Sequence, residues 1–154
     1  MASKLRNCFI AAAGVLGVLA ATGWSLHENP DRILNLAAEH GTGPVARLML
    51  EAGADIHFDH DSPLRWAAVN GHTDMVKILL DRGADIHVWG DFPLRWAATN
   101  GHVETVKLLL DYGANARANN DQALKSAIMN GHEDVQGIIR QYQNSTAYTT
   151  HSPG

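Results

Sequence analysis

Residues 62–87 read SPLRWAAVNGHTDMVKILLDRGADIH, and residues 92–117 read FPLRWAATNGHVETVKLLLDYGANAR. The two stretches start 30 residues apart (92 − 62). The same step separates four leucines, Leu34, Leu64, Leu94 and Leu124 (64 − 34, 94 − 64, 124 − 94). Self-similarity at a fixed period of about 20–50 residues is typical of a stacked repeat array. The sequence therefore predicts a row of similar units that bury their apolar faces against one another.

Each unit has the pattern of two short helices. Leu64, Ala67 and Ala68 lie at helical spacings of three and four and share one face. Glycine follows each predicted helix, at Gly71 and Gly83, where a helix often ends in a left-handed residue. Aspartates precede the first helix of every unit, at Asp31, Asp61, Asp91 and Asp121. We interpret them as side chains that accept backbone N–H groups at the helix start.

Four short motifs at these offsets resemble those of the ankyrin repeat family. Residues 62–68 (SPLRWAA) resemble its T-P-L-H-x-A-A opening, Gly71-His72 its G-H pair, residues 76–80 its V-x-x-L-L run and residues 83–85 its G-A-D. The resemblance covers about residues 31–143. It implies an all-α solenoid of helix pairs with short hairpin tips, because the period of 30 is shorter than the usual roughly 33 residues.

The predicted repeats span residues 31–60, 61–90, 91–120 and 121–143. The resemblance gives His72, His102 and His132 a structural role at helix starts. Residues 144–154 are small and polar, and we expect a disordered tail there.

Residues 1–26 form a hydrophobic segment, and residues 27–30 a linker. Residues 8–26 carry no charge, and as a helix they would extend about 28 Å, close to the roughly 30 Å of a bilayer core. Three interpretations remain open: a single-pass anchor, a cleaved signal peptide, and a helix buried against the repeats. Lys4 and Arg6 would keep the N-terminus of an anchor on the cytoplasmic or matrix side. Signal cleavage would instead give a secreted or periplasmic protein.

Charge and motif content argue against several function classes. The formal net charge is −4, or −6 without Lys4 and Arg6 (−4 − 2), so no basic footprint for nucleic acid is expected. The histidines that recur every 30 residues would stand roughly 10 Å apart in a stack, too far to share a metal. The sequence has no nucleophile–base arrangement and no phosphate-binding glycine loop. We therefore expect no enzyme activity, no cofactor and no small-molecule substrate.

The resemblance implies a protein partner that is recognised by the tips and the adjoining helix face. By position, the candidate binding residues are Phe58, His60, Val69, Val88, Trp89, Phe92, Thr99, Asn119 and Asn120. Arg65-Trp66 and Arg95-Trp96 are interpreted either as packing units that stack on one another or as part of a concave aromatic and basic surface. The predicted function is a protein–protein interaction module, either membrane-anchored or a small subunit of a membrane complex. The alternative is a secreted or periplasmic binding protein, such as an inhibitor of a partner enzyme.

Overall fold

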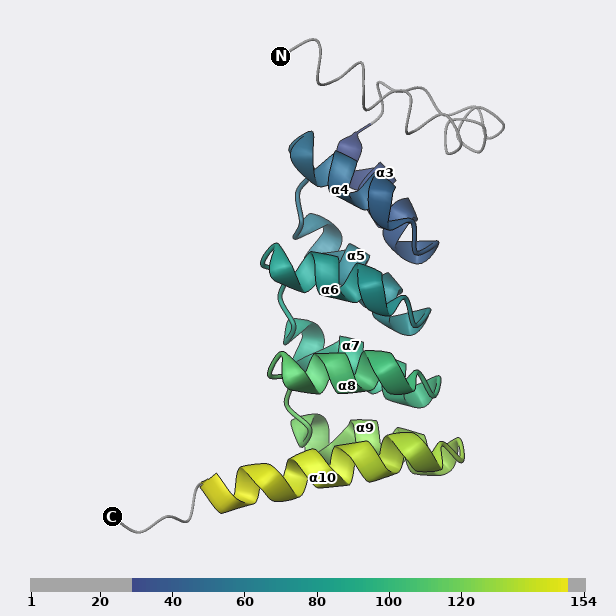
Figure 1. The fold of residues 1–154 in the computed structure, drawn as a ribbon, viewed down its shortest axis with the longest axis vertical. Helices are drawn as coiled ribbons and strands as arrows, with labels where there is room; N and C mark the ends of the chain where they lie inside the picture. Colours follow the sequence, from purple (N-terminus) through teal and green to yellow (C-terminus); the bar gives the residue numbers. More distant parts are fainter. Residues whose placement is uncertain (1–28, 150–154) are drawn as a thin grey trace.

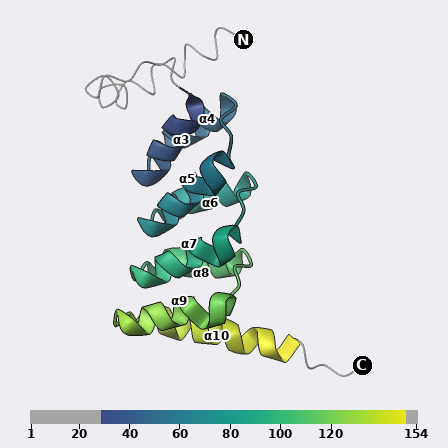
Figure 2. The ribbon, with the colours of Figure 1, turned by 180° about the vertical axis from the view of Figure 1, so that it is seen from behind.

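The chain stacks four helix pairs into an elongated array. A computed structural model describes residues 29–149, and in this range the chain forms eight helices and no strand. Figure 1 shows the pairs one above another from α3/α4 to α9/α10, and Figure 2 shows them from behind. The bounds are α3 (Pro30–Glu39), α4 (Gly43–Glu51), α5 (Phe58–Val69), α6 (Thr73–Asp81), α7 (Val88–Thr99), α8 (Val103–Asp111), α9 (Ala118–Met129) and α10 (Glu133–Thr149).

The predicted all-helical repeat fold is confirmed. The odd-numbered helices contact one another in sequence and so do the even-numbered ones, as a solenoid of stacked pairs requires. The predicted N-terminal hydrophobic helix falls outside the described residues. None of the helices between residues 29 and 149 combines the length and apolar character needed to cross a membrane.

The core lies between the layers, where the repeated leucines and alanines meet. Leu34, Leu64 and Leu94 are at most 1% exposed, and Ala67 and Ala68 are fully buried. These small side chains let neighbouring helices approach closely. Leu124 occupies the same position in the last pair and is only partly buried, because no further pair covers it. Burial therefore depends on neighbours, as a repeat array predicts.

Each tip contains three consecutive left-handed residues, which the sequence did not predict. Residues 59–61, 89–91 and 119–121 have φ between 47° and 66°. Gly90 is the one residue type among these nine that adopts this conformation without steric cost. The left-handed turn leads the chain from the loop into the right-handed part of each odd helix. Pro63 and Pro93 then lie in a first helical turn, where their missing N–H is not needed.

The prediction of a disordered tail from residue 144 is wrong for residues 144–149, where α10 continues to Thr149. The repeated glycines Gly53, Gly83 and Gly113 follow the earlier helices at left-handed φ values of 93° to 97°. Thirty residues after Gly113 stands Gln143, which is compatible with right-handed helix, so the last helix is not ended there. Residues 150–154 lie outside the described part of the chain.

Candidate functional site

A run of rings and guanidinium groups follows the tips and short helices of the second and third pairs. We call it the aromatic strip, and it consists of His60, Arg65, Trp89, Phe92, Arg95 and Trp96. The ring centroids of His60 and Trp89 lie 6.1 Å apart, and those of Trp89 and Phe92 5.7 Å apart in an edge-to-face arrangement. Phe92 and Trp96 follow at 5.8 Å. The contacts join two repeats into one aromatic surface.

Much of this surface faces solvent. Trp89 is 55% exposed and Trp96 37% exposed, and Trp66, on the same face of α5 that Trp96 occupies on α7, is 43% exposed. Large apolar side chains that are exposed to solvent often mark a contact surface.

Arg65 holds Trp89 in place from the neighbouring repeat. Its guanidinium carbon lies 3.9 Å from the centroid of the Trp89 ring, within the range of a cation–π interaction. The same guanidinium donates to the carbonyl oxygens of His60 (3.0 Å) and Asp59 (2.7 Å). The packing interpretation of the Arg–Trp units is thus right in kind, but the partner is the tip residue Trp89 and not Trp96.

The structure brings together three of the predicted binding residues, His60, Trp89 and Phe92. Val88, predicted as a binding residue, is only 7% exposed and is packed in the interior. The left-handed turn explains this, because it directs the side chain of Trp89 outward and leaves Val88 facing inward. Phe58 is half-buried.

The remaining predicted residues lie apart from the strip or at its edge. Val69 and Thr99 are half-buried at the opposite ends of α5 and α7. Asn119 and Asn120 are exposed at the next tip, where the Asn119 side-chain amide donates to the Gly90 carbonyl at 2.8 Å. The list of candidate binding residues omitted Arg65, Arg95 and Trp96, for which the sequence analysis left open a packing role and a place on a binding surface.

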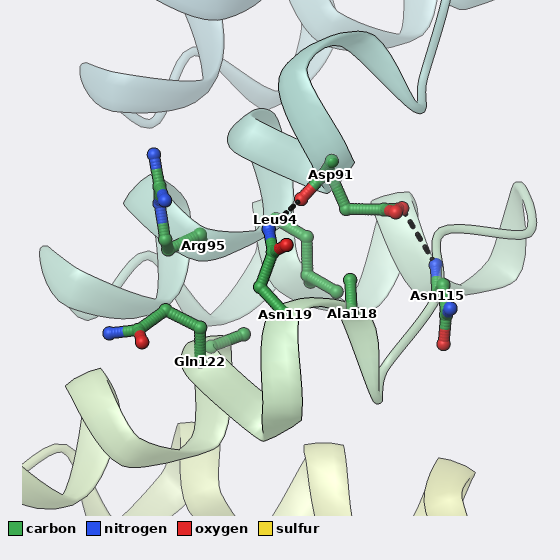
Figure 3. A pocket seen from close by; sticks show the side chains of 9 residues that line it. Asp91, Leu94, Arg95, Asn115, Ala118, Asn119 and Gln122 are labelled. Atoms are coloured by element: carbon green, nitrogen blue, oxygen red, sulfur yellow. Dashed lines mark hydrogen bonds between the residues drawn. The ribbon is translucent and has the colours of Figure 1, made fainter.

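A shallow hollow lies between α7 and α9, beside Arg95. Figure 3 shows Asn119 and Asp91 spanning it through their hydrogen bonds to Gly90 and Asn115. It has no room for a water-sized group, so it does not form a small-molecule pocket, which needs roughly 300–1,000 Å³. The residues that line it are Gly90, Asp91, Leu94, Arg95, Asn115, Ala118, Asn119, Gln122 and Ala123.

Histidines join each pair to the preceding one. His102 Nε2 lies 2.8 Å from the carbonyl oxygen of Val69, and His72 and His132 make the equivalent bond. A carbonyl oxygen only accepts, so each Nε2 carries the proton. His72 and His102 stand directly before α6 and α8, so the predicted structural role at helix starts is confirmed. Their side chains make no cap bond to their own helix, and the bond that each makes spans two repeats. Among residues 29–149 no group of three or more metal-ligating side chains is present.

The repeated aspartates also act differently from the cap interpretation. Asp61 Oδ1 accepts the backbone N–H of Asp85 at 2.8 Å, and Asp91 Oδ1 accepts that of Asn115 at 2.7 Å. Both carboxylates are 5% exposed. In both cases the side chain reaches the loop that leaves the same pair instead of its own helix, and Asp31 accepts the Asp55 N–H at 2.7 Å in the same way. These bonds fix the tips that carry the aromatic strip.

Comparison with known proteins gives one family. The family described as Ankyrin repeats (3 copies) matches the chain over residues 9–89 and 85–147. No curated protein matches the chain.

Proposed function

Since the chain belongs to the ankyrin repeat family, we propose that it binds a protein partner through the aromatic strip. Ankyrin repeats form protein–protein interaction modules and generally serve as non-enzymatic scaffolds. The observation that supports this surface is the unbroken ring contact from His60 to Trp96 with Trp89 more than half exposed. Tryptophan and arginine are the residue types that most often carry binding energy at interfaces.

The strip is preformed, which favours binding. Arg65 holds Trp89 through the cation–π contact and two hydrogen bonds to the tip backbone. Asp91 fixes the base of the same tip through the Asn115 N–H. A side chain already held in its bound position loses little conformational entropy when a partner docks.

Capture from the native source tests this proposal. Tagged full-length protein, wild type and Trp89→Ala, is used to pull down partners that are identified by mass spectrometry. We expect Trp89→Ala to capture markedly less partner while its melting temperature stays close to wild type, because Trp89 is mostly exposed. Lys107→Ala on the exposed side of α8 serves as the control and should capture normally. Equal capture by Trp89→Ala would exclude the strip, and a large loss of stability would give Trp89 a packing role.

We further propose that residues 8–26 hold the module in a membrane, with the N-terminus on the cytoplasmic or matrix side. The support is the nineteen-residue run without charge and the basic residues Lys4 and Arg6 before it. The competing proposal is signal cleavage, which would yield a secreted or periplasmic binding protein. Alkaline carbonate extraction of membranes together with N-terminal sequencing separates the two. A mature chain that begins near Ala21 would exclude the anchor, and a full-length chain retained in extracted membranes would exclude cleavage.

A further inference from the structure

Arg65 and Arg95 occupy the same position in successive repeats but have different surroundings. The hydrogen-bond donors of Arg65 are used by residues of the tips. Its side chain is 12% exposed and stacks on Trp89. It donates to the carbonyls of residues 59 and 60 and lies 3.5 Å from the Asp59 carboxylate. The tip residues facing Arg95 differ. Trp89 stands thirty residues after Asp59, so no carboxylate is available there, and Asn119 replaces Trp89.

Arg95 consequently keeps its hydrogen-bond donors unused. Within residues 29–149 its guanidinium makes no hydrogen bond or ion pair, and its one recorded contact is with the Phe92 ring at 5.4 Å. Figure 3 shows the guanidinium extended away from the hollow. A guanidinium has five N–H donors in a planar fork that fits the two oxygens of a carboxylate.

A second unpaired cation follows in the next repeat. Lys125 stands thirty residues after Arg95, is exposed, and makes no ion pair in the described part of the chain. Stacked helices lie roughly 8–10 Å apart, and an extended peptide in the polyproline II conformation advances about 3.1 Å per residue and returns to the same face every third residue. Two carboxylates three residues apart along an extended segment therefore match the spacing of Arg95 and Lys125.

We propose that the partner segment is acidic and extended, with one carboxylate on Arg95, a second three residues away on Lys125, and an adjacent apolar side chain on Trp96 and Trp89. This inference rests on the proposed function of the strip and adds the chemistry of its partner. The net charge of −4 disfavours a nucleic acid, whose closely spaced phosphates bind surfaces rich in Lys and Arg. Two isolated cations beside exposed rings fit a protein segment with few charges.

Peptide selection tests the assignment. A phage-displayed library of random dodecapeptides is selected on immobilised full-length protein, in parallel for wild type and Arg95→Gln. We expect the wild type to enrich peptides with two acidic residues three apart beside Trp, Phe or Leu, and Arg95→Gln to lose this enrichment.

A synthetic enriched peptide then gives the energetics by fluorescence anisotropy. Loss of a charge-assisted bond should weaken binding to Arg95→Gln about 10-fold or more. Arg82→Gln, an exposed arginine at the end of α6, is the matched control and should change the affinity less than about 2-fold. Changing the peptide's first acidic residue to its amide should weaken binding to the wild type but not to Arg95→Gln.

The outcomes separate this inference from the proposed function. If Trp89→Ala and Trp96→Ala weaken peptide binding but Arg95→Gln does not, the strip binds protein and the carboxylate assignment is wrong. If the enriched peptides are neutral, or a phosphoserine in place of the acid binds far more tightly, the assignment is likewise overturned. Peptide binding that survives the tryptophan substitutions as well would overturn both proposals.

Discussion

At the scale of single residues, the fold depends on pairs made by a glycine and a histidine one repeat later. A Cβ atom added to Gly71 would lie 2.5 Å from Nδ1 of His102, and one added to Gly101 would lie 2.6 Å from Nδ1 of His132. The glycine therefore has two functions, a left-handed φ and space for the ring that bonds back to the preceding repeat.

Gly101 and Gly131 form a matched pair for testing this. Their φ values are 75° and 74°, but nothing among residues 29–149 lies within 4 Å of a Cβ at Gly131. Both alanine variants incur the left-handed strain of roughly 1–2 kcal/mol. Gly101→Ala also displaces the His132 ring, and we expect it to lower the free energy of unfolding by about 1–3 kcal/mol more than Gly131→Ala.

Urea unfolding of both variants measures the difference. In a His132→Ala background the excess at Gly101 should vanish, because the ring that it collides with is gone. An equal cost for the two glycines would show that the histidine ring does not need this space.

Sequence analysis located these residues but not their partners. The histidine role came from resemblance, which suggested helix starts. The sequence did contain an indication that the histidines bond to the preceding repeat. In the first of the predicted repeats Thr42 replaces the histidine. In the structure the Thr42 hydroxyl donates to the Ala37 carbonyl within its own pair. The left-handed Trp89 had no such indication, because a bulky side chain rarely adopts positive φ, whereas Asp59 and His60 belong to residue types that are enriched there.

At the scale of elements, the C-terminal part of α10 takes the place of the loop that follows the even-numbered helix in the other pairs. Gln143 is 7% exposed, and its side-chain amide donates to the Ala116 carbonyl and to Asp121 Oδ1, both at 2.9 Å. In the third pair the equivalent carboxylate, Asp91, receives a backbone N–H from the following loop. The tail prediction failed because polarity of residues 144–149 was taken as absence of structure, whereas the residue that decides the helix is Gln143.

Gln143→Ala should therefore destabilise the last pair. Two acceptors lose their donor, and we expect the free energy of unfolding to fall by about 1–3 kcal/mol. Gln141→Ala is the control, since Gln141 is exposed on the same helix and should change stability by less than about 0.5 kcal/mol. Circular dichroism during urea titration gives both values, and a neutral Gln143→Ala would refute this stabilising role of α10.

A tyrosine on α10 makes stability depend on alkaline pH. The Tyr142 hydroxyl donates a hydrogen bond to the Asp111 carboxylate, and this bond raises the pKa of Tyr142 above its ordinary value of about 10. A raised pKa means that the folded state holds the proton more tightly. The stabilisation is therefore complete below about pH 10 and is lost as pH rises through the folded pKa.

Comparison with Tyr142→Phe measures this contribution. The difference in urea midpoint between wild type and Tyr142→Phe should favour the wild type at pH 8 and shrink towards pH 11. A difference that stays constant over this range would show that the bond to Asp111 does not couple to ionisation of the hydroxyl.

At the scale of the whole molecule, the hydrogen bonds between pairs make the array cooperative. The Val69 carbonyl accepts from both Asn100 and His102, each at 2.8 Å, and so connects the second and third pairs. In a one-dimensional array, such contacts between neighbours decide whether the repeats unfold together.

His102→Ala should weaken this connection. We expect native-state hydrogen exchange to divide into two groups of protected amides, residues 29–81 and residues 88–149, where the wild type shows one. His40→Ala provides the control, because His40 is exposed and its ring bonds within α3, to Leu36. If exchange remains uniform in His102→Ala, apolar packing alone couples the pairs.

The period, the helix pairs and the leucine core were all predictable from the sequence, because each depends on residues repeated at fixed spacing. The aromatic strip, our candidate binding surface, was predictable only in part. His60, Trp89 and Phe92 were found by position, but the unused donors of Arg95 appear only when its surroundings are compared with those of Arg65. That difference comes from unlike residues at equivalent tips, which a repeat pattern does not specify.

The side from which each hydrogen bond between helix pairs is donated has a consequence for biosynthesis. In the hydrogen bonds to the backbone, a histidine or asparagine of the later pair donates to a carbonyl of the earlier one. A ribosome adds about 5–20 residues per second, so each new pair emerges within roughly 2–6 s, far longer than helices need to form. Every pair therefore leaves the exit tunnel after the backbone carbonyls that accept its histidine and asparagine side chains have been synthesised.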